Sequence, residues 1–182
     1  MYFDSPGRAN TEKTIELAKK RAEELGIDEI VVASTHGDTG LLAVEAFPGA
    51  KVAVVTYHCG FNVPFETVMK PEVRETLQRR GAAVVQATHA LSGLERSIAK
   101  KHGGMYPVLL MADVLRLFGH GTKVCVEVSI MAADAGVLSG KEVVAIGGTG
   151  RGADTALVIK PANQSDLFDM RIREIICKPR TF

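Results

Sequence analysis

Apolar residues at helical spacing alternate along this chain with short β-branched runs. After Asn10 or Thr11, either of which can cap a helix, Ile15, Ala18, Ala22 and Leu25 recur at every third or fourth position up to Gly26. This spacing puts the apolar side chains on one face and predicts a helix that ends at Gly26. The run that follows, Glu29–Ala33, is short and β-branched and predicts a strand.

The alternation continues through the first half of the chain. Strands are predicted over 51–56 and 82–86, and helices over 39–46 and 71–80, where Pro71 opens the second helix. Pro48-Gly49 and Gly81 provide the stops. A β-α-β-α-β order predicts a parallel sheet with helices packed on its faces.

Residues 88–121 break this rhythm. Two short helices, over 93–100 and 108–117, are expected on either side of Gly103-Gly104. Because their apolar residues need cover, we interpret the segment as a helical insertion within a single α/β domain that spans residues 1–182.

The helix expected after Gly121 is apolar around most of its circumference. Val124, Val128, Met131 and Ala135 repeat at helical spacing, and Lys123, Glu127 and Asp134 leave only a narrow polar stripe. Such a helix is buried on most sides. A position between the sheet and a second subunit and a purely intrachain core explain the pattern equally well.

Strands are predicted to complete the chain. The run 154–160 follows the run 142–146 so closely that the two are expected to pair antiparallel. The segment 171–178 alternates apolar and charged residues, as an edge strand does.

Composition narrows the class of protein. The chain has 182 residues, 46% apolar and 24% charged, which is ordinary for a soluble globular domain. A net charge of +1 argues against a nucleic-acid partner. No run is long enough to cross a membrane, and the first residues lack a secretory pattern. Three widely spaced cysteines without a C-x-x-C motif favour free thiols in the cytoplasm.

Two loops rich in glycine and hydroxyl groups carry most of the functional information. They are residues 34–40 and 147–155, and each follows directly on a predicted strand. Glycine lets the backbone come close to a ligand, and free N–H groups bind anions. On its own, the first loop fits an anion site at a helix N-terminus and a capped turn without a ligand equally well. The presence of the second loop favours binding of one phosphorylated ligand.

The second loop also matches a dinucleotide fingerprint in part. Gly148, Gly150 and Ala153 fit G-x-G-x-x-A, and Asp169 follows about twenty residues later. The fingerprint must open a helix, however, and residues 155–159 are predicted to form a strand. The dinucleotide interpretation is therefore disfavoured.

Taken in order, these motifs resemble the pyruvate kinase C-terminal domain family in its stand-alone form. Ser34, Gly37 and Thr39 match hydroxyl and glycine positions of the kinase loop that holds an effector phosphate, whereas His36, Asp38 and Gly40 depart from it. Gly152-Ala153-Asp154-Thr155 is similar to the later glycine loop of the kinases.

The resemblance implies a three-layer α/β/α sandwich whose mixed, mainly parallel sheet has about five strands in the order 3-2-1-4-5, with strand 5 antiparallel. Both loops would then meet at the topological switch point. Stand-alone members are associated with flavin mononucleotide (FMN), which is the ligand expected here. The expected contacts are Ser34, Thr35, His36, Gly37, Asp38, Thr39, Gly40, Thr56, Tyr57, Gly147, Gly148, Thr149, Gly150, Arg151, Gly152, Ala153, Asp154 and Thr155.

The resemblance does not extend to pyruvate kinase catalysis, because the kinase barrel and its metal and substrate residues are absent. Two functions remain open: a flavin-dependent enzyme of unknown reaction, and a non-catalytic regulatory module that senses a phosphorylated metabolite. A homo-oligomer is expected.

Three histidines form a further pattern. His36, His58 and His89 each follow one of the first three predicted strands, so all three can face one crevice. They are candidates for acid–base catalysis, for polar loop residues that only satisfy backbone groups, or, least favoured, for metal ligands with Cys59. Tyr57 and Phe61 are placed to cover a flavin ring, and Tyr106 to act from a flap.

Overall fold

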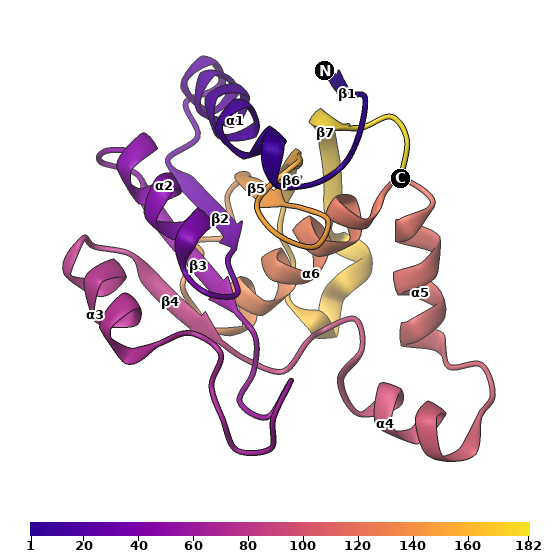
Figure 1. The fold of residues 1–182 in the computed structure, drawn as a ribbon. Coiled ribbons are helices and arrows are strands. Elements are labelled where there is room, and N and C mark those ends of the chain that lie inside the picture. Colours follow the sequence, from indigo (N-terminus) through magenta and orange to yellow (C-terminus); the bar gives the residue numbers. More distant parts are fainter.

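The protein folds around one twisted sheet covered by helices on both faces (Figure 1). The computed structural model describes all residues, 1–182. The sheet has the strand order β1-β7-β6-β5-β2-β3-β4. Its strands are β1 (Tyr2–Phe3), β2 (Glu29–Ala33), β3 (Lys51–Thr56), β4 (Ala83–Gln86), β5 (Val143–Gly147), β6 (Thr155–Lys160) and β7 (Arg171–Pro179).

The predicted five-strand core is confirmed. β4, β3, β2 and β5 run parallel in the expected order, and β6 pairs antiparallel with β5. Two strands extend this core, because β7 pairs antiparallel with β6 and the two-residue β1 pairs parallel with β7. The expectation that 171–178 forms a free edge is therefore wrong at its end, where Tyr2 pairs with Lys178. A two-residue strand has no periodicity from which it could be predicted.

Three helices cover one face of the sheet: α1 (Thr11–Leu25), α2 (Asp38–Ala46) and α3 (Pro71–Arg79) (Figure 1). The predicted apolar face of α1 is confirmed for Ile15, Ala18 and Ala22, which are buried in the core beneath it. It is wrong for Leu25, which is 41% exposed because the helix ends there. Gly26 ends α1 in the left-handed conformation, as its position after the last apolar residue indicates.

On the opposite face, α6 (His120–Asp134) packs on the sheet, α5 (Pro107–Arg116) packs on α6, and α4 (Gly93–His102) packs on α5. The two helices predicted in the insertion are present as α4 and α5. α6 packs directly on β2, β5 and β6 and is covered by α5, so its burial is accounted for within one chain. None of the helices is both long and apolar enough to cross a membrane.

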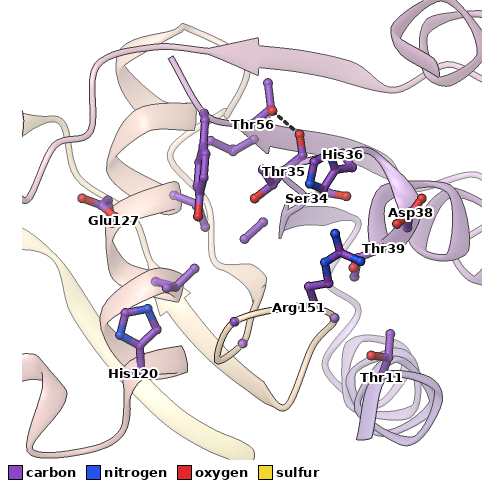
Figure 2. Close-up of a pocket in the computed structure, with 18 of the residues that line it drawn as sticks. Thr11, Ser34, Thr35, His36, Asp38, Thr39, Thr56, His120, Glu127 and Arg151 are labelled. Carbon is purple, nitrogen blue, oxygen red and sulfur yellow. Dashed lines mark hydrogen bonds between the residues drawn. The ribbon is translucent and has the colours of Figure 1, made fainter. Parts of the chain in front are cut away.

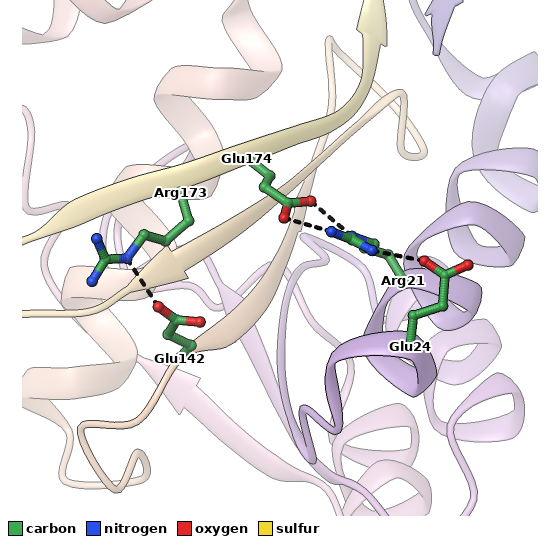
Figure 3. A network of polar contacts seen from close by, with 5 residues as sticks. All are labelled: Arg21, Glu24, Glu142, Arg173 and Glu174. Atoms are coloured by element: carbon green, nitrogen blue, oxygen red, sulfur yellow. Dashed lines mark hydrogen bonds and ion pairs between the residues drawn. The ribbon is translucent and has the colours of Figure 1, made fainter.

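Ion pairs link α1 to the far strands of the sheet (Figure 3). Arg21 donates from Nε and Nη2 to the carboxylate of Glu174 on β7, at 2.8 and 2.7 Å, and from Nη1 to Glu24. These hydrogen bonds hold the pKa of Glu174 below its ordinary value. Because the side chains are largely exposed, the network orients α1 more than it stabilises the fold.

Close contact between α6 and β6 depends on Gly121. A β-carbon at this position would lie 2.1 Å from Oγ1 of Thr155 and 2.8 Å from Oδ1 of Asp154. We predict that Gly121→Ala lowers the free energy of unfolding by about 1–3 kcal/mol, because overpacking outweighs the better helix propensity of alanine. Chemical denaturation followed by circular dichroism measures this. An unchanged or increased stability would show that propensity dominates and that the contact is loose.

Candidate functional site

A cavity of about 750 Å³ opens at the carboxyl ends of the parallel strands. Two loops and one helix enclose it: the loop between β2 and α2, the loop between β5 and β6, and α6 (Figure 2). β2 and β5 are parallel neighbours in the sheet, with β3 and β4 following on one side and β6 and β7 on the other. The two loops therefore meet at the topological switch point of the sheet. Such switch points are where open α/β sheets bind ligands, and the volume is typical of a small-molecule site.

The first loop is shaped by hydrogen bonds inside the chain. Oγ of Ser34 accepts from the N–H of Gly40 at 3.0 Å, and the carbonyl of Thr35 accepts from Oγ1 of Thr56 at 2.8 Å. Gly37 has a φ of +101°, and a β-carbon there would lie 2.2 Å from Cγ1 of Val73. The turn therefore requires glycine and leaves the first N–H groups of α2 without acceptors in the chain.

The second loop is held by the buried carboxylate of Asp154. Oδ2 accepts from the N–H groups of Gly7 at 2.9 Å and Thr149 at 3.0 Å, and Oδ1 accepts from the hydroxyl of Thr155 at 2.7 Å. Asp154 and Thr155 are both fully buried. These hydrogen bonds hold the loop through residues that do not line the cavity, and they determine which of its other residues face the cavity.

The same loop lies tightly against the start of α1. A β-carbon at Gly152 would lie 2.3 Å from Oγ1 of Thr11, and Oγ1 of Thr11 accepts from the N–H of Ala153 at 3.0 Å. Arg151 is exposed, and its side chain extends toward Thr39 of the first loop (Figure 2).

The structure thus divides the predicted binding residues into two groups. Those that line the cavity are Ser34, Thr35, His36, Asp38, Thr39, Thr56, Tyr57, Gly148, Gly150, Arg151 and Gly152. The remaining ones do not line it: Gly37, Gly40, Gly147, Thr149, Ala153, Asp154 and Thr155. The second group shapes the loops, and the hydroxyl of Thr155 is directed to Asp154 and away from the cavity surface.

The three predicted histidines separate in the same way. His36 and His89 line the cavity, whereas His58 does not, and its Nδ1 donates to the carbonyl of Cys59 at 2.7 Å. The rings of His58 and His89 are 5.3 Å apart, but no three His, Cys, Asp or Glu side chains form a group that could hold a metal ion.

An aromatic cluster lines one part of the cavity. The ring centroids of Tyr57 and Phe61 are 4.1 Å apart, and those of Phe61 and His89 are 4.8 Å apart. Burial lowers the pKa of His89 to about 4, and the charges of Lys123, His58 and Arg96 act in the same direction against Glu127. The imidazole is therefore neutral at physiological pH, and its Nδ1 has no hydrogen-bond partner. Tyr106, predicted as a flap residue, does not line the cavity.

Two parts of the cavity lining were not predicted from the sequence: the wall formed by α6, and the rim formed by Arg8 and Thr11 near the N-terminus of the chain. Lys123 and Glu127 line the wall as an ion pair with each side chain only 5% exposed, and Oε1 of Glu127 accepts from the N–H of Leu91 at 3.0 Å. Two opposite charges four residues apart on an otherwise apolar helix were the available signal. The other unpredicted lining residues include Arg8, Thr11, Arg96, Arg116 and His120.

We predict that Asp154→Ala lowers the free energy of unfolding by about 2–4 kcal/mol, because it leaves two N–H groups and a hydroxyl without their acceptor. Asp154→Asn should cost less, since one amide oxygen still accepts from Gly7 and Thr149 and the amide N–H can donate to Thr155. Urea denaturation of both variants provides the comparison. Equal losses, or none, would contradict this role for the carboxylate.

A pH dependence follows from the low pKa of His89. Between about pH 6.5 and pH 4, the unfolded chain binds a proton at this residue that the folded chain does not. The free energy of unfolding should therefore fall as the pH drops from 7 to 5, and His89→Gln should reduce that fall by about 2 kcal/mol. Denaturation curves at both pH values test this, and identical pH dependence in the two proteins would refute it.

Comparison with known proteins agrees with this architecture. The profile of the family described as "Pyruvate kinase, alpha/beta domain" matches residues 12–159. Among solved structures, a pyruvate kinase from Cryptosporidium parvum is similar at 15% identity with a TM-score of 0.44. That match covers 84% of this chain but only 23% of the kinase. The chain belongs to the pyruvate kinase alpha/beta domain family.

Proposed function

We propose that the protein binds a phosphorylated small molecule in this cavity, and that FMN is the preferred ligand. The observation that carries the proposal is the pairing of two surfaces in one cavity: free backbone N–H groups beside Arg151, and the aromatic cluster of Tyr57, Phe61 and His89. FMN has a phosphate at one end and a flat aromatic ring system at the other.

The loop end suits the phosphate. The N–H groups of Asp38 and Thr39 open α2, where the helix dipole favours an anion. The hydroxyls of Thr35 and Thr39 and the guanidinium of Arg151 line the same end. The carboxylate of Asp38 opposes an anion, and the positive charge of Arg151 offsets it.

The aromatic cluster suits the ring. Tyr57 and Phe61 offer flat apolar surface, and a neutral His89 adds a third ring without a charge that would need solvation. Val128, Met131 and Leu42 supply further apolar lining. The cavity therefore combines a polar end with an apolar and aromatic part, which matches a ligand that has a phosphate at one end and a ring at the other.

A non-catalytic module that senses a phosphorylated metabolite is the second candidate. The groups proposed to bind the phosphate do not include the aromatic cluster, so a phosphorylated ligand without an aromatic ring could also bind at the loop end. In addition, we identify no nucleophilic side chain in the cavity that has both a base and an acid beside it. Pyruvate kinase activity is not part of either proposal.

We also propose a cellular compartment and an oligomeric state for the protein. All three cysteines are free thiols, which supports a reducing compartment such as the cytoplasm. Leu94, Met105 and Leu117 on and beside α4 and α5 are 74–80% exposed, which supports the expectation of a homo-oligomer.

The test compares FMN with riboflavin, which lacks the phosphate. We predict that protein purified without added cofactor shows flavin absorption or takes up FMN on titration, at least tenfold more tightly than riboflavin. Arg151→Ala and Thr39→Val should each weaken FMN about tenfold, the loss of a charge-assisted or neutral hydrogen bond, and leave riboflavin unchanged. Arg79→Ala on α3, outside the cavity, is the matched control.

A colourless protein that takes up no FMN would refute the flavin proposal. If that protein still binds phosphorylated sugars and loses them on Arg151→Ala, the sensing module is the correct function. Equal affinity for FMN and riboflavin would refute the placement of the phosphate at the loop end.

A further inference from the structure

Basic side chains from α6 and from the neighbouring helices α4 and α5 line the cavity but are not among the proposed contacts to FMN. We include all of them, with Glu127, in the α6 wall. Arg96 from α4, Arg116 at the end of α5, and His120 and Lys123 from α6 all line the cavity. Figure 2 shows His120 and Glu127 on α6, across the cavity from Thr39 and Arg151. Three helices that are distant in sequence from the glycine loops therefore bring basic side chains to a second region of the same cavity.

Acidic side chains only partly balance this cluster. Glu127 is the one carboxylate on the wall, and it is already held by Lys123 and by the N–H of Leu91. Arg116 pairs with Asp113, whose side chain is 70% exposed. The side chain of Arg96 forms neither an ion pair nor a hydrogen bond in the chain, and its guanidinium stands 5.7 Å from the Phe61 ring centroid. The wall therefore carries uncompensated positive charge.

Burial is the main cause of the lowered pKa values in this cluster, and neighbouring positive charges add to it. Burial lowers the pKa of His120, and the charges of Lys123 and Arg116 lower it further, against Asp154 and Glu127. Burial also lowers the pKa of Lys123, against the charge and the hydrogen bond of Glu127, and the charges of Arg116 and Arg96 act in the same direction as burial. An anion bound among these groups would relieve their mutual repulsion.

The aromatic cluster adjoins this wall. His89 is only 9% exposed, lines the cavity and has no partner for Nδ1, and its ring contacts Phe61, over which Arg96 lies. A ligand held here would therefore meet basic groups at one end and, at the other, either the aromatic cluster or the flavin ring that we propose lies on it.

We infer that the α6 wall binds the carboxylate of a second, flat small molecule beside the phosphorylated ligand. The inference rests on the proposed function for the identity of that neighbouring ligand. A carboxylate suits the wall better than a phosphate, because Lys123 and Arg116 are already paired with carboxylates and only Arg96 is unpaired, so a monoanion balances the wall and a dianion would leave an excess of negative charge. The guanidinium of Arg96 offers the planar pair of donors that a carboxylate accepts.

The probes are benzoate, phenyl phosphate and benzyl alcohol, which share one ring and differ in charge. We expect benzoate to bind the full-length protein, with and without FMN, at least tenfold more tightly than the other two. In ¹⁵N-resolved spectra, benzoate should shift the amide signals of residues 116–124. Similar affinity for benzoate and benzyl alcohol would overturn the inference, as would tighter binding of phenyl phosphate at this wall or benzoate shifts confined to residues 35–40.

Variants separate this site from the loop end. The double variant Arg96→Gln/Arg116→Gln should weaken benzoate at least tenfold, whereas Arg79→Gln/Arg80→Gln on and at the end of α3 should leave it unchanged. Arg79, Arg80 and Arg96 are exposed and Arg116 is half-buried, so circular dichroism of both double variants first checks that folding is preserved. Unchanged benzoate affinity in the first double variant would overturn the inference.

Failure of the inference can be distinguished from failure of the proposed function. Benzoate binding that Arg151→Ala does not alter, in a protein that takes up no FMN, upholds the carboxylate wall and rejects the flavin proposal. FMN binding without benzoate binding rejects the wall and leaves the flavin proposal intact.

Discussion

The buried carboxylate of Asp154 is the contact on which the geometry of the site depends. It is fully buried and accepts hydrogen bonds from the N-terminal segment at Gly7, from the glycine loop at Thr149 and from the hydroxyl of Thr155. No basic side chain pairs with it, so dipoles alone stabilise its charge. Gly121, near the start of α6, lies directly against Asp154 and Thr155. The hydrogen-bonded position of Asp154 therefore also sets how closely the start of α6 approaches the loop.

This arrangement explains why one small domain can present two different chemical surfaces in one cavity. The sheet places the β2–α2 and β5–β6 loops side by side, and Asp154 holds the second loop against α1. α6 crosses the other side of the opening with a buried ion pair in its wall. One end of the cavity therefore offers N–H groups and hydroxyls, the other offers basic side chains, and the aromatic cluster lines the same cavity.

Most of the fold could be predicted from local patterns. The helical spacing of Ile15, Ala18 and Ala22 and the β-branched runs identified the elements of the core, because each signal lies within one element. The strand order came from the resemblance to the family. β1 could not be predicted, since two residues have no period and its pairing partner, Lys178, is near the other end of the chain.

The site was predicted less completely, for a related reason. The glycine loops were found because their composition is unusual, but which of their residues face a ligand depends on contacts across 147 positions, from Asp154 to Gly7. Thr155 was therefore predicted as a ligand contact although its hydroxyl serves Asp154. The wall formed by Lys123 and Glu127 was visible only as a polar stripe, and local sequence does not reveal that it faces a cavity.

We propose that an anionic ligand binds at the meeting point of the two loops. Titration of the ¹⁵N-labelled protein with FMN is the decisive test, because each backbone amide reports its own contact. The largest shifts are expected at Asp38, Thr39, Gly150 and Arg151, with smaller ones at Tyr57. Shifts confined to residues outside both loops, or no shift at saturating FMN, would contradict it.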